Sequence, residues 1–147
     1  MTGGERQPLA LLFVCLGNIC RSPMAAGLAR KIFPDEVKVE SAGIVPYGGS
    51  AAPEAIEVMK SGFDVDLRGH RSRGVTECDL DAFDIVIAMD THVYDHLKDT
   101  YRVYSGRLIM WEIRDPFMRG LEAFRECASD IDGSMNKIRR IVEERLG

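Results

Sequence analysis

The chain has 147 residues, of which 46% are hydrophobic and 29% are charged, and its formal net charge at pH 7 is −4. These values are typical of one soluble domain that is large enough to bury a core of its own. The acidic balance argues against a general nucleic-acid-binding protein, which would carry a basic face, so we expect no nucleic-acid partner.

The amino-terminal segment MTGGERQP lacks the charged, apolar and small-residue parts of an export signal. We expect residues 1–8 to be a flexible tail and residues 9–147 to form the domain. The longest apolar run, residues 9–16, is too short to cross a bilayer, so no membrane insertion is expected. The four cysteines show neither a zinc-ligand spacing nor a disulfide framework. A cytoplasmic monomer with reduced thiols is the simplest interpretation.

The first half of the chain predicts two strands, each followed by a helix. Residues 9–15 are continuously apolar, as in a strand that is buried on both faces. Ser22 is predicted to cap the next helix, with Pro23 at its first position. A second strand is predicted at residues 37–42. A short helix is predicted from Pro53 to Met59, closed by Ser61 and Gly62.

The second half continues the alternation. Thr76 is predicted to cap a short helix after a loop rich in arginine, strands are predicted at residues 84–89 and 107–113, and helices at residues 91–98 and 121–146. Strands that alternate with helices predict an α/β fold with a parallel sheet and right-handed crossovers. Ligands of such sheets bind beyond the carboxyl ends of the strands, and Cys15 ends the first strand.

The segment CLGNICRSP, residues 15–23, has the composition of an anion site. The N–H groups at a helix amino terminus attract anions, and a turn that wraps around Cys15 would favour its thiolate. Gly17 allows close backbone approach, and Asn18 tolerates the left-handed conformation of a tight turn. Arg21 offers a planar fork for two phosphoryl oxygens. Together these residues predict nucleophilic attack on a phosphate monoester through a phosphocysteine intermediate.

This segment resembles the active-site signature of the low-molecular-weight protein tyrosine phosphatases. ESAG at residues 40–43, DIVIAMD at 84–90 and DPF at 115–117 follow in the order of that family. The resemblance implies a single domain with a four-stranded parallel sheet, helices on both faces, and a phosphate loop between strand 1 and helix 1. It also implies a two-step hydrolysis of phosphotyrosine in a phosphorylated protein substrate, without a metal or another cofactor.

The resemblance also implies roles for individual residues. Cys15 would be the nucleophile, Arg21 would bind the phosphate and stabilise the transition state, and Asp115 would protonate the leaving oxygen and then activate water. Tyr47 and Phe117 would form opposite walls of the substrate cleft. The phosphate would be bound, and the loop supported, by the remaining loop residues: Leu16, Gly17, Asn18, Ile19, Cys20 and Ser22. Within this set, Ser22 would hydrogen-bond the thiolate, and Asn18 would hold the shape of the loop with Ser41 and His70 behind it.

Several alternatives remain open at this point. Asp-Pro-Phe also resembles the protein-arginine phosphatases of the same fold, which tend to carry threonine where this chain has Ile19. Because Ile19 faces the substrate, we favour phosphotyrosine. An arsenate reductase of similar fold is disfavoured, because its loop differs from residues 15–23 of this chain. In addition, Cys78 has no obvious second thiol with which to complete a redox relay. A non-catalytic phosphate-binding module would need neither the Cys15 thiol nor the Asp115 acid.

Cys20 allows two interpretations. A free cysteine is usually a buried packing residue. Because Cys20 lies five residues from Cys15, it could also trap oxidised Cys15 as a reversible disulfide. The family resemblance favours this protective role, which would make the enzyme redox-sensitive.

Overall fold

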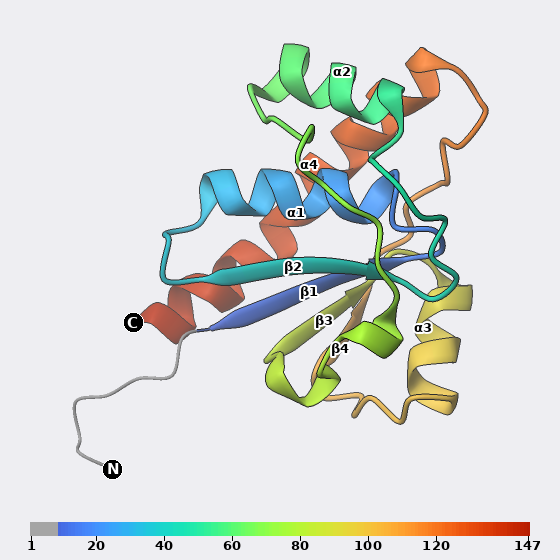
Figure 1. Cartoon of the computed structure of the whole chain (residues 1–147). Coiled ribbons are helices and arrows are strands. Elements are labelled where there is room, and N and C mark those ends of the chain that lie inside the picture. The colour runs from blue at the N-terminus through green and yellow to red at the C-terminus, as the bar shows by residue number, and fades with distance from the viewer. Residues whose placement is uncertain (1–8) are drawn as a thin grey trace.

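The computed structural model describes residues 9–147, so the predicted tail at residues 1–8 lies outside the described part of the chain. Four parallel strands form one sheet in the order β2-β1-β3-β4 (Figure 1). The strands are β1 (Ala10–Cys15), β2 (Lys38–Gly43), β3 (Ile85–Ala88) and β4 (Leu108–Met110). The predicted four-stranded parallel sheet is therefore confirmed.

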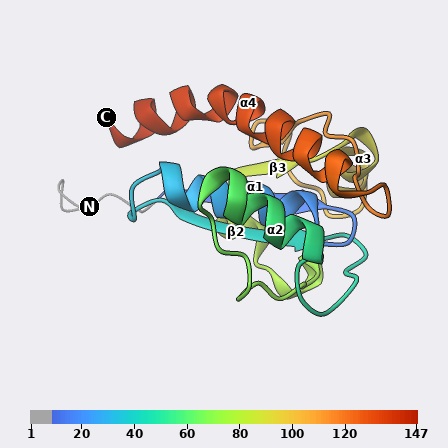
Figure 2. The same cartoon turned by 90° about the horizontal axis from the view of Figure 1, so that it is seen from above.

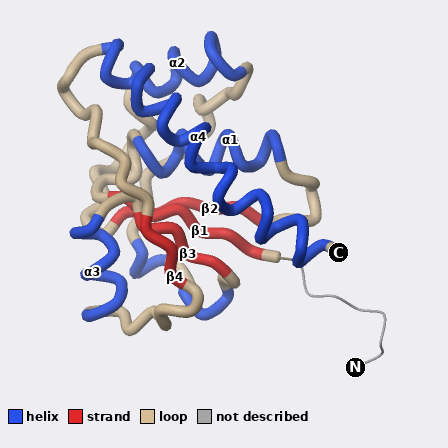
Figure 3. Tube along the Cα trace, turned by 180° about the vertical axis from the view of Figure 1, so that it is seen from behind, coloured by secondary structure: helices blue, strands red, loops and turns tan. Residues whose placement is uncertain are grey.

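Helices cover both faces of the sheet, as predicted. They are α1 (Arg21–Ile32), α2 (Pro53–Phe63), α3 (Thr91–Asp99) and α4 (Leu121–Leu146). Alternate residues of β1 enter different cores: Leu11 and Phe13 pack with the residues of α1, α2 and α4, whereas Leu12 and Val14 pack with those of α3. Figure 2 shows α1, α2 and α4 together above the sheet, and Figure 3 shows α3 on the side of the sheet away from them. Burial on both faces explains why β1 reads as an unbroken apolar run.

Two predicted segments have different lengths in the structure. The fourth strand was predicted at residues 107–113 but spans only Leu108–Met110. The chain nevertheless stays beside β3, because the Trp111 N–H donates to Ala88 and the Ile113 N–H donates to Met89. Trp111 is fully buried against Phe13. The helix predicted to close at Ser61 and Gly62 continues to Phe63 and ends at Asp64, whose φ of 54° is left-handed.

Two predicted helix caps are wrong. Helix α1 begins at Arg21 with Cys20 in the cap position, and the Ser22 hydroxyl makes no cap bond. It turns instead toward Cys15 and Asn18. Thr76 lies inside a short 3-10 turn, Val75–Glu77, which Glu77 stabilises by accepting a hydrogen bond from the backbone N–H of Gly74. At Ser22 a local propensity yields to a tertiary contact, and at Thr76 it yields to the local bond between Glu77 and Gly74.

Residues that can form an active site lie at the carboxyl edge of the sheet. Cys15 ends β1, Asp90 follows β3, and the segment after β4 leads to Asp115. Within residues 9–147, none of the helices combines the length and the apolar character that a membrane span requires.

Candidate active site

The loop between β1 and α1, residues 16–20, is fixed by its carbonyl groups, all of which point outward. Leu16 accepts a hydrogen bond from the Val45 N–H, Gly17 accepts from the Tyr47 N–H, and Ile19 accepts from the Ala52 N–H. The carbonyls of Asn18 and Cys20 are also bonded, to His70 and to the Met24 N–H. No N–H group of residues 16–20 donates to another group within residues 9–147. The loop N–H groups are therefore unpaired within the described residues and available to an oxyanion, as in known anion-binding turns.

Asn18 holds this loop from behind. Its backbone is left-handed, with φ 57°, and its side chain is fully buried. Its amide nitrogen donates to Ser22 Oγ at 2.7 Å and to Ser41 Oγ at 3.0 Å, and its Oδ1 accepts from the Arg73 N–H at 2.9 Å. The roles expected for Asn18, Ser41 and His70 agree with this geometry. Arg73 is a further support that the sequence reasoning missed.

Gly43, the last residue of β2 and of the ESAG segment, allows the loop to lie against the sheet. A Cβ at this position would lie 2.7 Å from the Leu16 carbonyl oxygen and 3.0 Å from the Asn18 nitrogen. Both neighbours are backbone atoms that cannot move without opening the loop. Only glycine fits here.

Cys15 lies at the base of the hollow, where its Sγ is 2.9 Å from Ser22 Oγ. Because Asn18 donates to the same hydroxyl oxygen, the hydroxyl hydrogen is free to point at the sulfur. The alternative acceptor, the Ala42 carbonyl, is 3.5 Å away. This geometry agrees with the expected bond between Ser22 and the thiolate.

Arg21 reaches the same hollow from the first turn of α1, and only 3% of its side chain is exposed. Its Nη1 donates to Asp90 Oδ2 at 2.7 Å and to the Ile113 carbonyl at 3.0 Å. Burial alone would lower the pKa of Arg21, but the Cys15 sulfur and two nearby carboxylates raise it. The guanidinium is thus fixed and charged.

Asp90 is the second residue that the sequence reasoning missed. Its Oδ1 accepts from the Val93 N–H at 2.8 Å and so caps α3, while its Oδ2 holds Arg21. Burial would raise the pKa of the Asp90 carboxyl, but these two donors keep that pKa below its ordinary value. The signal was present in the sequence, because Asp90 ends the DIVIAMD segment at the carboxyl end of a buried strand.

Asp115 approaches the other terminal nitrogen of Arg21. Its Oδ2 is 3.8 Å from Arg21 Nη2, and 44% of its side chain is exposed. Its Oδ1 accepts from the Phe117 N–H at 3.1 Å, which fixes the carboxylate over the loop that follows it. The structure therefore brings Cys15, Arg21 and Asp115 to one cleft.

Residues 10–146 match the family model described as low molecular weight phosphotyrosine protein phosphatase. The chain belongs to this family. A relative from Ralstonia nicotianae, the probable low molecular weight protein-tyrosine-phosphatase EpsP, is 35% identical over 124 residues, which cover 80% of this chain and 84% of that protein.

Solved structures agree with this assignment. The low molecular weight protein tyrosine phosphatase from T. tengcongensis has a TM-score of 0.82 and 30% identity, covering 90% of this chain and 98% of that one. The YwlE arginine phosphatase from Geobacillus stearothermophilus has a TM-score of 0.85 and 27% identity, covering 95% and 96%. Fold likeness thus extends to both a protein tyrosine phosphatase and an arginine phosphatase.

In this low-molecular-weight phosphatase the cleft has a volume of about 390 Å³. The predicted loop residues divide into two groups. Those that line the cleft are Leu16, Gly17, Ile19 and Cys20, with Cys15 and Arg21. Asn18 and Ser22 are fully buried and lie behind the loop, so their role is support rather than direct contact with a ligand.

Tyr47 and Phe117 both line the cleft, but they do not face each other across it as expected. Their ring centroids are 5.6 Å apart at an angle of 58°, so the two rings are in contact. No substrate ring fits between them. They form one aromatic wall, because the loops that carry them bury part of each ring against the other.

Cys20 also lines the cleft, with 4% of its surface exposed. Burial, and after it the Asp115 carboxylate, raises the pKa of the Cys20 thiol far above its ordinary value. Burial likewise raises the pKa of Cys127, on α4, to about 12. Both are neutral thiols at pH 7. Within residues 9–147, the His, Cys, Asp and Glu side chains form no group of three or more that could hold a metal ion.

Proposed function

We propose that this phosphatase hydrolyses phosphotyrosine in proteins, with Cys15 as nucleophile and Arg21 as phosphate ligand. The observation that carries the proposal is that Cys15, the Arg21 guanidinium and loop residues 16–20 line one cleft, while no N–H group of residues 16–20 is hydrogen-bonded within residues 9–147. Fixed donors of this kind stabilise the charge of a phosphoryl group in flight.

The reaction would proceed in two displacements. The Cys15 thiolate attacks phosphorus, the bond from phosphorus to the phenolic oxygen breaks, and Asp115 gives its proton to that oxygen. A water molecule then attacks the phosphocysteine, Asp115 takes a proton from it, and the sulfur–phosphorus bond breaks to release phosphate. The Ser22 hydroxyl, 2.9 Å from the sulfur, would stabilise the thiolate both as nucleophile and as leaving group.

Phosphoarginine is the second candidate substrate. It is favoured by the TM-score of 0.85 with the YwlE arginine phosphatase and by Phe117 after Asp-Pro. Phosphotyrosine is favoured by Ile19, whose apolar side chain lines the cleft beside the aromatic wall. A guanidino group would lose water against this surface without gaining a hydrogen-bond partner.

The nucleophile is tested with Cys15→Ser. This variant should hydrolyse no aryl phosphate above background, because a serine hydroxyl in the same place has no base to activate it, yet it should still bind phosphate. Wild-type enzyme quenched in acid should carry phosphate on Cys15. A chelator should leave the wild-type rate unchanged. Cys78→Ser, at a half-buried cysteine outside the cleft, is the control. Full turnover by Cys15→Ser would disprove the mechanism.

The general acid is tested with Asp115→Asn and two substrates that differ in their leaving groups. A positioned acid contributes about 10²–10⁴-fold, and its proton matters only where the leaving oxygen is basic. The variant should therefore lose about that factor on phosphotyrosine peptides and far less on an activated aryl phosphate. Asp132→Asn, at an exposed aspartate of α4, should change neither rate. Equal losses on both substrates would show that the proton comes from another group.

Substrate preference is tested with Ile19→Thr. The wild type should hydrolyse phosphotyrosine peptides well ahead of phosphoarginine peptides, since each unsatisfied N–H costs about 1–3 kcal/mol, which corresponds to roughly tenfold to a hundredfold in rate. Threonine supplies a hydroxyl and should move the ratio of kcat/KM toward phosphoarginine. Val45→Thr, the same kind of change at the exposed rim of the cleft, should not. A wild type that is faster on phosphoarginine would establish the second candidate.

We further propose that Cys20 protects Cys15 from irreversible oxidation. Peroxide would oxidise the Cys15 thiolate to a sulfenic acid; the Cys20 thiol would then attack that sulfur, forming a disulfide and releasing water. A dithiol should restore activity to the peroxide-treated wild type but not to Cys20→Ala. Cys127→Ala, which removes another buried thiol, should recover like the wild type. Equal recovery by Cys20→Ala would exclude the protective role.

A further inference from the structure

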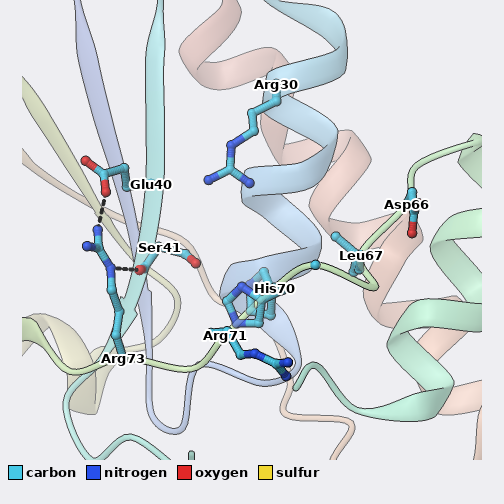
Figure 4. Close-up of a pocket in the computed structure, with 10 residues that line it drawn as sticks. Arg30, Glu40, Ser41, Asp66, Leu67, His70, Arg71 and Arg73 are labelled. Carbon is cyan, nitrogen blue, oxygen red and sulfur yellow. Dashed lines mark hydrogen bonds and ion pairs between the residues drawn. The ribbon is translucent and has the colours of Figure 1, made fainter. Parts of the chain in front are cut away.

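A second cavity, of about 300 Å³, lies between α1, β2 and the loop after α2 (Figure 4). Its polar wall consists of Arg30 from α1, Glu40 and Ser41 from β2, and Asp66, His70, Arg71 and Arg73 from the loop after α2. None of these residues lines the cleft that holds Cys15. We call this space the rear cavity.

The charges that line the rear cavity are unevenly paired. Of the two carboxylates in its wall, Glu40 already holds Arg73 in an ion pair and Asp66 holds Arg68, which lies outside the wall. Arg30 and Arg71 form no ion pair with a carboxylate in the part of the chain that the structure describes. Two positive charges at this cavity therefore lack a direct counter-charge.

Both of these guanidinium groups keep donors for a ligand. Arg30 uses Nε and Nη2 to hold the Val39 carbonyl, at 3.1 and 2.8 Å, which leaves Nη1 unused. Arg71 uses Nη1 for Ser50 Oγ at 3.1 Å, which leaves Nε and Nη2 unused. Arginine forks of this kind match the oxygens of phosphate.

His70 completes the wall between the cavity and the catalytic loop. Its Nε2 is 2.7 Å from the Asn18 carbonyl oxygen. A carbonyl only accepts, so Nε2 donates and Nδ1 is left without a partner in the described chain. Burial lowers the pKa of His70, and the positive charges of Arg30 and Arg73 lower it further. An anion beside these groups would relieve that repulsion.

We propose that the rear cavity is a binding site for a small phosphate-bearing anion, held by Arg30 and Arg71 next to His70. A phosphate group carries close to two negative charges at pH 7, which matches the two unpaired guanidinium groups, whereas a carboxylate would leave one of them uncompensated. The ligand would contact the support of the loop rather than its hollow. Binding here and at Cys15 can therefore be measured separately.

The test uses the full chain with Cys15→Ser, so that no ester is consumed, and inorganic phosphate as the probe. The chain has only three histidines, so the ring resonances of His70 report on the rear cavity by NMR, and the Gly17 amide reports on the front hollow. At constant ionic strength set with chloride, phosphate should move both signals. Adding Arg71→Met or Arg30→Met should weaken the His70 response roughly tenfold or more and leave the Gly17 midpoint in place.

Arg140→Met is the matched control, because it removes the same charge from an exposed side chain of α4 outside the cavity wall; it should leave both midpoints unchanged. Arg71 is exposed, so its variant should fold even where Arg30→Met, which loses the contact to Val39, does not. Repetition with glycerol 3-phosphate distinguishes free phosphate from a phosphate ester as the tighter ligand. A His70 signal that does not move, or that responds alike in Arg71→Met and Arg140→Met, would overturn the proposal. No turnover is measured, so failure of the proposed hydrolysis would not affect this result.

Discussion

The left-handed backbone of Asn18 is the constraint on which the site depends. A φ of 57° at a residue other than glycine is unfavourable and persists only where the surroundings impose it. Here the Asn18 side chain meets two hydroxyl groups and one backbone N–H, and its carbonyl meets His70. These bonds reverse the chain over a few residues. With the chain reversed, the carbonyls of residues 16–20 are all hydrogen-bonded, whereas their N–H groups have no partner within residues 9–147 and are available to an anion.

Asp90 also serves two parts of the structure at once. One carboxylate oxygen caps α3 and the other holds Arg21, so the helix that covers one face of the sheet is tied to the guanidinium that begins the helix on the other face. Gly43 has a similar role in packing, since it lets the end of β2 lie against the loop without a side chain between them. Local structure and site geometry therefore share the same contacts. A substitution at either residue would affect both.

Sequence reasoning predicted the elements better than their ends. The apolar run of β1 and the helical spacing of α4 indicated the right elements because burial on two faces, or along one stripe, imposes a strong pattern. Ser22 was misassigned as a cap because its hydroxyl meets the distant Cys15 and Asn18 instead. Thr76 was misassigned because it lies inside a short 3-10 turn that begins one residue before it. The roles of Asp90 and Arg73 were missed since both act on residues distant in sequence, Arg21 and Asn18. The contact between Tyr47 and Phe117 depends on two loops whose relative position no local pattern specifies.

Arg21 interacts with two carboxylates at unequal distances, and this asymmetry suits the proposed mechanism. Asp90 binds it at 2.7 Å and is itself fixed as a helix cap, whereas Asp115 approaches to only 3.8 Å and is more exposed. A phosphate dianion that enters the hollow competes for the same guanidinium. It would displace the weaker partner, because an exposed pair at that distance contributes little. Arg21 would stay in place on Asp90, and Asp115 would be released to serve the leaving oxygen. The unequal distances thus allow one arginine to be fixed before the substrate arrives and still be available to it.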